Sequence, residues 1–578
     1  MTDPTAIDDR TVAVAGGARL AVTVTRPPGG APGPAVLIRT PYGRDSLRPE
    51  AAGWARRGYP CVVADVRGRY GSGGVFHPFR HEEHDGAALL DWVLAQDFCD
   101  GRVLLAGASY GAYCALVTAA VAPPEVLGGV LVAVPVLGPG ETAREPGGAA
   151  RLACRAGWWT EHAGASRSRV PPPDVSGLLT AVPPATIPHL ALGERPAGWD
   201  DLWSAPRRGA LWDRMPTGVP LLAVGGLHDP FAADTAELAA RWDGPARLLL
   251  GPWGHRLDAP RPGAALAGRR IGAVYTAWAA AALSGTATGS GGLIAVDGDG
   301  QWRRFPLPRR TGQGRTVRAG PAGQGDTVPA GPARPGHTVP ADSVADDRMV
   351  PVDRAGHGCG VPVGAVADGG TVRVDPAVQG RAVPVDPVTP GRTAPLHPAG
   401  HTFVADPTRP FLSHPPGADL PWRRSDPPAS DRAIAWTDPL PRGELRGPVT
   451  VRLRATADAA DADWIARVSL CVGNRPPVQL AHAVVRRAHR PGVPVRLAID
   501  LPPVGAAVPG GARLGVEIAG HHWPRHARNP HTGDDPITTA GPLLAARRDV
   551  VLDGIDLPWH PPRTAAVAAA DVVKEIAQ

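Results

Sequence analysis

The chain has 578 residues, and its 72 glycines and 68 prolines make up about a quarter of them. This share approaches the roughly 25–30% typical of disordered chains, but 43% of the residues are apolar and 16 are tryptophan, which requires a large buried core. The net charge of +6 is spread out without a basic run and is too dilute to argue for a nucleic-acid partner, so none is expected; the single lysine, Lys574, excludes a phosphate-binding-loop lysine.

The six cysteines are scattered and form no Cys-x-x-Cys pair, which is typical of reduced thiols rather than of a disulfide framework. The first thirty residues contain no basic segment followed by an apolar run. No stretch approaches the roughly 18–20 apolar residues of a membrane helix. We therefore expect a cytoplasmic protein without a membrane partner; the sequence does not indicate its oligomeric state.

Residues 1–137 predict the first part of an α/β core. Alternating residues on either side of Gly16-Gly17 predict a hairpin. Continuous apolar runs follow, as in parallel strands covered by helices on both faces, and residues 84–94 separate two of them with helical spacing. The runs are 34–38, 61–66, 103–106, 130–134, 221–224 and 247–250. This is the order of βαβ units.

Residues 138–218 interrupt that order. They are rich in tryptophan and contain short helical pieces separated by prolines. Because they stand between two strands of the predicted sheet, we expect a helical lid over the carboxyl edge of the sheet, where α/β proteins bind ligands. The core is expected to resume over residues 219–288.

Residues 289–578 predict a β-sandwich domain of the jelly-roll type. Strand-like alternation recurs between turns, and no helix is expected before the C-terminal tail. The alternating segments are 293–305, 449–455, 466–472, 495–501 and 512–518.

Residues 311–400 within this domain carry an 11-residue repeat. Thr316, Thr327 and Thr338 each begin a Thr-Val-x-Ala segment, and later segments keep the same phase. One interpretation is a stack of short rungs. However, the segment has no aromatic residue, no isoleucine and one leucine, which favours an extended or disordered insertion.

A Gly-x-Ser-x-Gly motif centred on Ser109 lies between a predicted strand at 103–106 and a helical run at 112–122. This strand–turn–helix is the context of a nucleophile elbow. A serine held there presents its hydroxyl above the sheet, at a helix N-terminus that favours developing negative charge. We predict that Ser109 is a catalytic nucleophile.

The acid and base of a triad follow in the order Ser, Asp, His that this fold uses. Asp229 comes after the predicted strand at 221–224, and His255 comes after the strand at 247–250. Both loops open on the sheet edge that carries Ser109, which predicts that the three side chains meet. His228 is a rival base, but its neighbour Asp229 is better placed as the acid, and His255 has the glycine-rich approach.

These motifs resemble those of the cocaine-esterase-like and X-Pro dipeptidyl-peptidase family of α/β-hydrolase serine hydrolases. The resemblance covers nearly the whole chain except 311–400. It differs in the acid loop, where Leu227-His228 replaces bulky aromatics, which leaves the shape of the acyl pocket open. The matching segments are 39–42, 65–74, 91–92, 99–103, 225–231, 251–255, 523–525, 528–529 and 532–533.

The resemblance implies a mechanism. Ser109 attacks a carbonyl, His255 moves the proton, and Asp229 orients the imidazole. The Tyr110 backbone N–H and the Tyr42 hydroxyl hold the oxyanion, and each donor lowers the activation barrier by roughly 3–4 kcal/mol. Without the family resemblance, the sequence around Tyr42 predicts only an ordinary half-exposed aromatic residue in a turn.

Two further clusters of side chains bear on the site. Trp158 and Trp159 either line the acyl pocket or form the core of the lid itself. Four histidines cluster at 521–531, but the matching family segment is a structural loop at a strand end. We therefore expect no metal and no cofactor.

The function that the sequence predicts is hydrolysis of a small carboxylic ester, or of an amide, through an acyl-enzyme. An X-Pro dipeptidyl-peptidase is the alternative, because residues 138–218 hold eight acids and nine arginines and neither show nor exclude a clamp for an α-amine. A non-catalytic binding protein is more remote, because the triad is complete.

Overall fold

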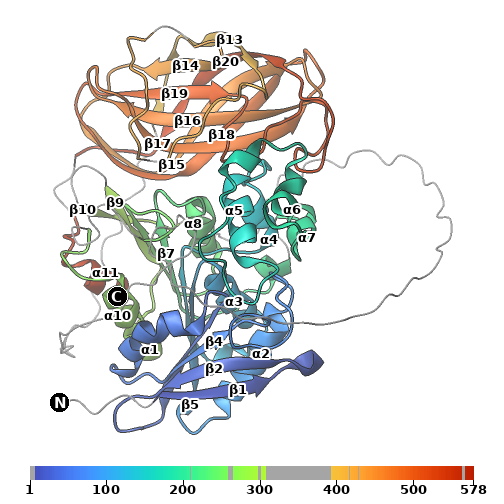
Figure 1. Ribbon diagram of the computed structural model, residues 1–578. Helices are drawn as coiled ribbons and strands as arrows, with labels where there is room; N and C mark the ends of the chain where they lie inside the picture. The colour runs from blue at the N-terminus through green and yellow to red at the C-terminus, as the bar shows by residue number, and fades with distance from the viewer. Residues whose placement is uncertain are drawn as a thin grey trace, which may run out of the picture.

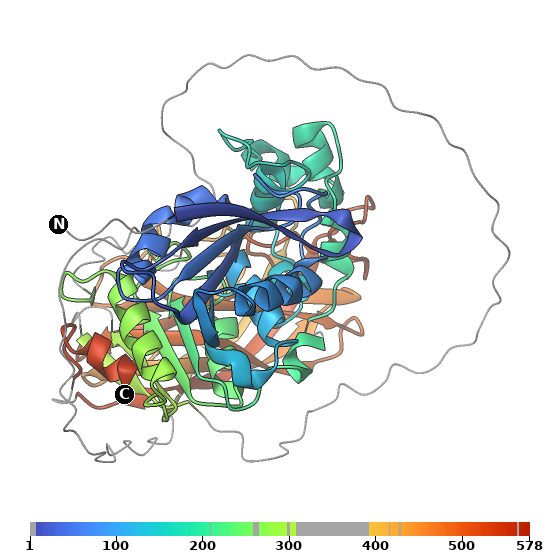
Figure 2. The same ribbon diagram turned by 90° about the horizontal axis from the view of Figure 1, so that it is seen from below.

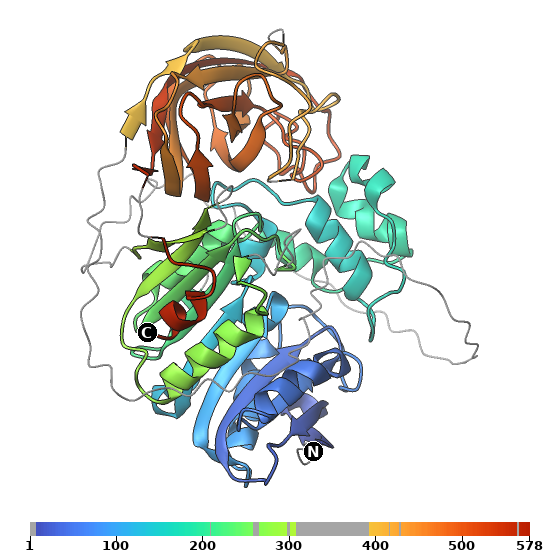
Figure 3. The ribbon, with the colours of Figure 1, turned by 90° about the vertical axis from the view of Figure 1, so that its left-hand side faces the viewer.

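The computed structural model describes residues 7–207, 210–257, 265–296, 301–307, 392–415, 417–426, 429–562 and 566–578. A mixed sheet covered by helices forms one end of the molecule, and an all-β part forms the other (Figure 1). A helical segment lies against both of them at one side (Figures 1 and 3). The predicted α/β core and all-β C-terminal part are thus confirmed.

The mixed sheet has ten strands, in the order β1-β2-β4-β3-β5-β6-β7-β8-β9-β10. The seven strands from β4 to β9 are parallel, and the antiparallel hairpin predicted around Gly16-Gly17 forms one edge. The strands are β1 Ile7–Ala13, β2 Arg19–Thr25, β3 Gly33–Thr40, β4 Cys61–Asp65, β5 Cys99–Ala108, β6 Leu127–Ala133, β7 Leu221–Gly226, β8 Ala246–Gly251, β9 Gly291–Val296 and β10 Gln301–Phe305.

Helices cover both faces of this sheet, which explains the continuous apolar runs. Alternate strand residues belong to different cores: Leu105 lies in the core that includes residues of α2, α3 and α8, whereas Leu104 lies in the core that includes residues of α1, α10 and α11. Figure 2 shows helices on the two sides of the sheet. The helices are α1 Arg48–Ala55, α2 Glu82–Leu94, α3 Tyr110–Ala119, α8 Ala232–Arg241, α10 Ile271–Leu283 and α11 Val572–Ala577.

The segment 293–305 corrects the predicted boundary at residue 289. It forms β9 and β10, which extend the mixed sheet through parallel pairing of β9 with β8. The physical reason is burial on both faces: Leu293 and Ile294 lie in opposite cores, as in the other parallel strands. The C-terminal helix α11 also returns to this part of the molecule and packs against α10.

The all-β part contains two antiparallel sheets that enclose one apolar core. The alternating burial of β15, inward residues buried and outward residues exposed, shows that each sheet turns one face to this core. The first sheet holds β11 Arg392–Ala394, β13 Gly400–Ala405, β15 Gly443–Ala457, β18 Val495–Val508, β20 Ala546–Leu557 and β21 Trp559–His560. The second holds β12 Leu396–His397, β14 Arg432–Thr437, β16 Asp461–Cys471, β17 Val478–Ala488 and β19 Arg513–Ala519.

Most of the predicted insertion at 311–400 lies outside the described residues. Its last part, 392–400, forms β11, β12 and the start of β13, so the insertion ends earlier than the sequence predicted. The reason is visible in the side chains: Ala394 and Leu396 are buried in the core of the all-β part.

The helical segment lies between β6 and β7, and its core is built from tryptophans. Its α5 is fastened to the all-β part by backbone hydrogen bonds from the N–H groups of Leu152 and Ala153 to the carbonyls of Arg525 (2.9 Å) and Pro524 (3.2 Å). Its helices are α4 Pro139–Ala143, α5 Ala153–His162, α6 Ile187–Leu192 and α7 Trp199–Ser204. Within the described ranges, no helix has the length and apolar character needed to cross a bilayer.

Candidate active site

Ser109 stands on a tight turn between β5 and α3. Its φ of 54° and ψ of −118° lie outside the regions that most residues adopt, so the turn stores backbone strain. The flanking glycines permit it: a Cβ on Gly107 would lie 2.2 Å from the carbonyl oxygen of Gly111, and one on Gly111 would lie 2.9 Å from that of Arg39. The turn therefore requires both glycines of the motif, as a nucleophile elbow does.

The structure brings Ser109, His255 and Asp229 together at the carboxyl ends of β5, β8 and β7. The Ser109 Oγ lies 2.9 Å from His255 Nε2, and His255 Nδ1 lies 3.0 Å from Asp229 Oδ1. The Asp229 side chain is fully buried, and its Oδ1 also accepts the Phe231 N–H at 3.1 Å. With Nδ1 donating to the carboxylate, Nε2 presents its lone pair to the serine hydroxyl.

The rival base, His228, lies elsewhere. Its backbone N–H donates to the Trp253 carbonyl at 3.0 Å, and its imidazole lies beside Gly417 of the all-β part. The imidazole that contacts Ser109 is that of His255.

The two predicted oxyanion donors both lie at the Ser109 pocket. The Tyr110 N–H is the first amide of α3 and has no acceptor within the helix. The Tyr42 hydroxyl oxygen accepts the indole N–H of Trp158 at 3.1 Å, which fixes the position of this hydroxyl.

The Tyr110 side chain anchors the start of α3. Its hydroxyl donates to the buried Glu82 carboxylate and accepts the Phe79 N–H at 2.7 Å. Its ring stacks on Trp158, with centroids 5.7 Å apart. Burial raises the pKa of Tyr110 well above its usual value and also raises the pKa of Glu82. These contacts hold the Tyr110 amide in place behind Ser109.

A pocket opens beside the serine hydroxyl. Trp158 lines it, whereas Trp159 lies behind, packed in the core of the helical segment against Phe79 and Trp199. Trp158 thus lies at the pocket, and both tryptophans belong to the core of the helical segment. The lining residues are Tyr42, Phe79, Ser109, Tyr110, Val136, Arg155, Trp158 and His255.

Arg155 also lines the pocket and was not predicted from the sequence. It is the one residue of the described pocket lining that carries a permanent positive charge. It is 6% exposed, and its Nε contacts the sulfur of Cys154 at 3.4 Å. Among the described residues, no carboxylate lies within ion-pair distance of its guanidinium. Helical spacing contained the signal, because Arg155 stands three residues before Trp158 and shares its face of α5.

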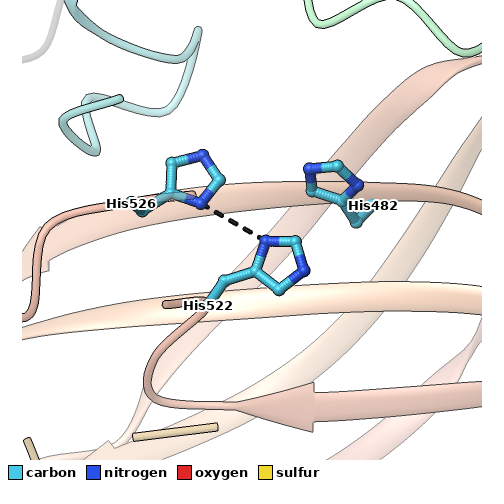
Figure 4. A group of neighbouring side chains, drawn as sticks. All are labelled: His482, His522 and His526. Atoms are coloured by element: carbon cyan, nitrogen blue, oxygen red, sulfur yellow. Dashed lines mark hydrogen bonds between the residues drawn. The ribbon is translucent and has the colours of Figure 1, made fainter. Parts of the chain in front are cut away.

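The C-terminal histidines form two groups. His521 packs against His531, with ring centroids 5.2 Å apart. His522 and His526 instead meet His482, which projects from β17 (Figure 4). Each of these three offers a ligand nitrogen, and the nitrogens lie within 4.8 Å of one another. The sequence placed the loop correctly at a strand end but could not show that His482 joins it.

The parallel sheet, the strained serine turn and the Ser–His–Asp chain of hydrogen bonds define the α/β-hydrolase class. Residues 16–256 match the profile of the X-Pro dipeptidyl-peptidase (S15) family, and residues 386–558 match that of the X-Pro dipeptidyl-peptidase C-terminal non-catalytic domain. Cocaine esterase from Rhodococcus sp. (strain MB1 Bresler) is 29% identical over 276 residues, 41% of this chain. The chain belongs to this cocaine esterase/X-Pro dipeptidyl-peptidase family.

The cocaine esterase alignment spans about half, 47%, of that protein. Solved structures match the fold over nearly the full chain. An α-amino acid ester hydrolase is 17% identical with a TM-score of 0.68, and an aminopeptidase from a marine sediment archaeon, Thaumarchaeota archaeon, is 19% identical with a TM-score of 0.66; each match covers 97% of both chains. A CocE/NonD family hydrolase from Staphylococcus aureus is 13% identical with a TM-score of 0.57, covering 96% of this chain and 94% of that one.

Proposed function

We propose that this protein is a serine hydrolase that cleaves small carboxylic esters through an acyl-enzyme intermediate. The observation that carries the proposal is the chain of hydrogen bonds from Ser109 through His255 to the buried Asp229. The positive φ of Ser109 and the pocket at its hydroxyl support the same assignment.

The geometry supplies each step of acyl transfer. Ser109 Oγ attacks the ester carbonyl while its proton passes to His255 Nε2, 2.9 Å away. The Asp229 carboxylate stabilises the imidazolium and holds its tautomer. The imidazolium then protonates the leaving alcohol, and a water molecule, deprotonated by the same imidazole, cleaves the acyl-enzyme.

The negative charge of the tetrahedral intermediate develops on the former carbonyl oxygen. We assign its stabilisation to the Tyr110 N–H and the Tyr42 hydroxyl, because both lie at the pocket that contains Ser109. The N-terminus of α3 adds a favourable dipole at the same place.

The charge of the pocket favours an ester over a dipeptide. An X-Pro dipeptidyl-peptidase must hold the α-ammonium of its substrate, which requires a carboxylate or carbonyl cluster in the site. Among the described residues that line the pocket, none is acidic and one is the guanidinium of Arg155. The dipeptidyl-peptidase remains the second candidate, because the family profile that bears that name covers the whole site.

We also propose roles for the finer parts of the fold. The helical segment at 138–218 would act as a lid, because its α5 supplies Arg155 and Trp158 to the pocket. The two sheets of the C-terminal part would form a jelly roll that supports α5 through the backbone hydrogen bonds to Arg525 and Pro524.

The test is labelling with a fluorophosphonate, comparing the protein with Ser109→Ala and, as a matched control, Ser176→Ala in the helical segment. Labelling of the protein and of the control, but not of Ser109→Ala, is expected. Equal labelling of all three, or of none, would refute the assignment of Ser109. A panel of aryl esters and Gly-Pro or Ala-Pro amides then decides the substrate class, and faster turnover of the amides would contradict the esterase assignment.

A further inference from the structure

The three histidines His482, His522 and His526 form a buried cluster outside the proposed active site (Figure 4). His482 comes from β17, and the other two come from the loop after β19. They are 8%, 1% and 2% exposed, respectively. We propose that this cluster binds one transition-metal ion of the Zn²⁺ class through three imidazole nitrogens.

The spacing of the nitrogens fits a metal site. The Nδ1 atoms of His522 and His526 are 3.3 Å apart. Two imidazole nitrogens bound to a tetrahedral ion at about 2.0–2.1 Å are separated by about 3.3–3.4 Å. The same distance is at the long limit of hydrogen bonding. All three ligand nitrogens lie within 4.8 Å of one another, so a small closing movement of His482 would complete the coordination.

A carboxylate orients one of the ligands from behind. His526 Nε2 lies 2.8 Å from Glu145 Oε1, and Glu145 in turn accepts Arg151 at 2.7 Å. The carboxylate therefore fixes the proton on Nε2 and directs the Nδ1 lone pair of His526 toward His522. Carboxylate–histidine–metal arrangements have this form.

The donor set of the cluster is three imidazole nitrogens. Arg467, which faces His482 across the strand pair, is itself paired with Glu517 at 2.5 Å. Imidazole nitrogens suit Zn²⁺, Co²⁺, Ni²⁺ or Cu²⁺ and not Ca²⁺ or Mg²⁺, which prefer oxygen ligands.

The cluster also holds buried nitrogens that lack partners. Within the described part of the chain, His482 Nδ1 and His522 Nε2 make no hydrogen bond. Buried polar atoms are rarely left in this state. An ion bound at His482 Nδ1 would supply the favourable interaction that this buried atom lacks.

The site would join two parts of the molecule. Glu145 belongs to the helical segment, whereas the histidines belong to the all-β part. His522 and His526 also flank Pro524 and Arg525, whose carbonyls hold the start of α5. A bound ion would therefore stiffen the contact that positions α5, independently of the reaction at Ser109.

The experiment titrates the full-length protein, freed of metal with a chelator, with Co²⁺ and then Zn²⁺. We expect the visible absorption bands of a four- or five-coordinate Co²⁺ at one ion per chain, their loss when Zn²⁺ displaces it, and a higher melting temperature with Zn²⁺. His522→Gln and His526→Gln should abolish the bands and the thermal shift. Glu145→Gln, which removes only the orienting carboxylate, should weaken binding about 10–100-fold.

His521→Gln is the matched control, because His521 is a buried neighbour whose ring nitrogens make no hydrogen bond with described residues. It should bind Co²⁺ like the unmodified protein. Absence of stoichiometric binding by the unmodified protein would overturn the proposal without any variant. Equal binding by His522→Gln and His521→Gln would overturn it as well, since the ion would then lie elsewhere.

Discussion

The guanidinium of Arg155 leads to a prediction about which esters this enzyme prefers. Arg155 lines the pocket beside Ser109, is 6% exposed and has no ion-pair partner among the described residues. Its contacts include the Phe231 ring, 5.8 Å from the guanidinium carbon, and the Cys154 sulfur, and neither is a carboxylate that balances the charge. We therefore expect esters that carry a carboxylate to be better substrates than neutral esters of the same size.

Replacing the Arg155 guanidinium by a neutral amide measures how much it contributes to kcat/KM. A hydrogen bond between charged groups contributes about 1.5–3 kcal/mol, which corresponds to roughly 10–100-fold in kcat/KM. Arg155→Gln should lose this factor on an anionic ester and change little on a neutral one. Arg195→Gln, which alters a surface arginine paired with Asp200 in the same segment, is the control and should leave both rates unchanged.

The assay uses two pairs of esters. In the first pair, 4-acetoxybenzoate carries a carboxylate on the leaving group and 4-tolyl acetate does not. In the second pair, a monoalkyl glutarate carries a carboxylate on the acyl group and an alkyl valerate does not. Arg155→Met should also melt at a higher temperature than the unmodified protein, because it removes a buried charge that no carboxylate of the described residues balances. A neutral-ester preference in the unmodified protein, or an equal loss on both esters in Arg155→Gln, would refute the reasoning.

Three other predictions concern the site and the core. Asp229→Asn should lower kcat by about 10⁴-fold at neutral pH, because it removes the charge that sets the His255 tautomer; steady-state kinetics measures this. Tyr42→Phe should lower kcat by about 10²–10³-fold with little change in labelling stoichiometry, since one oxyanion donor is lost. Burial raises the pKa of Glu50 from 4.5 to about 7, so stability falls as pH rises between these values; Glu50→Gln should raise the free energy of unfolding by about 3 kcal/mol at pH 8 and by little at pH 4, measured by urea unfolding.

The motif-bearing positions were predictable from sequence because each lies directly after an apolar strand. Ser109, Asp229 and His255 follow strands that are buried on both faces, and parallel strands end at one edge. Local pattern and chain order were therefore enough to predict that these side chains meet. Their catalytic roles stay a prediction until the labelling and kinetic experiments are done.

Features that depend on packing between distant segments could not be predicted in the same way. The segment 293–305 alternates like a strand of either sheet, and its pairing with β8 decides where it belongs. His482 stands forty residues before His522, and the pairing of β16 with both β17 and β19 is what brings their ends together. A single sequence contains no period or motif that reports such pairings.

The proposed active site is distributed over more of the chain than its three central residues indicate. The hydroxyl of Tyr42, from the α/β core, is held by the indole of Trp158, from α5. The start of α5 is in turn held by the backbone of the all-β part, at the carbonyls of Arg525 and Pro524. A change at this distant contact should therefore alter the proposed oxyanion stabilisation, and so kcat, while the Ser109–His255 hydrogen bond stays intact, because Ser109 and His255 both stand at the ends of strands of the parallel sheet.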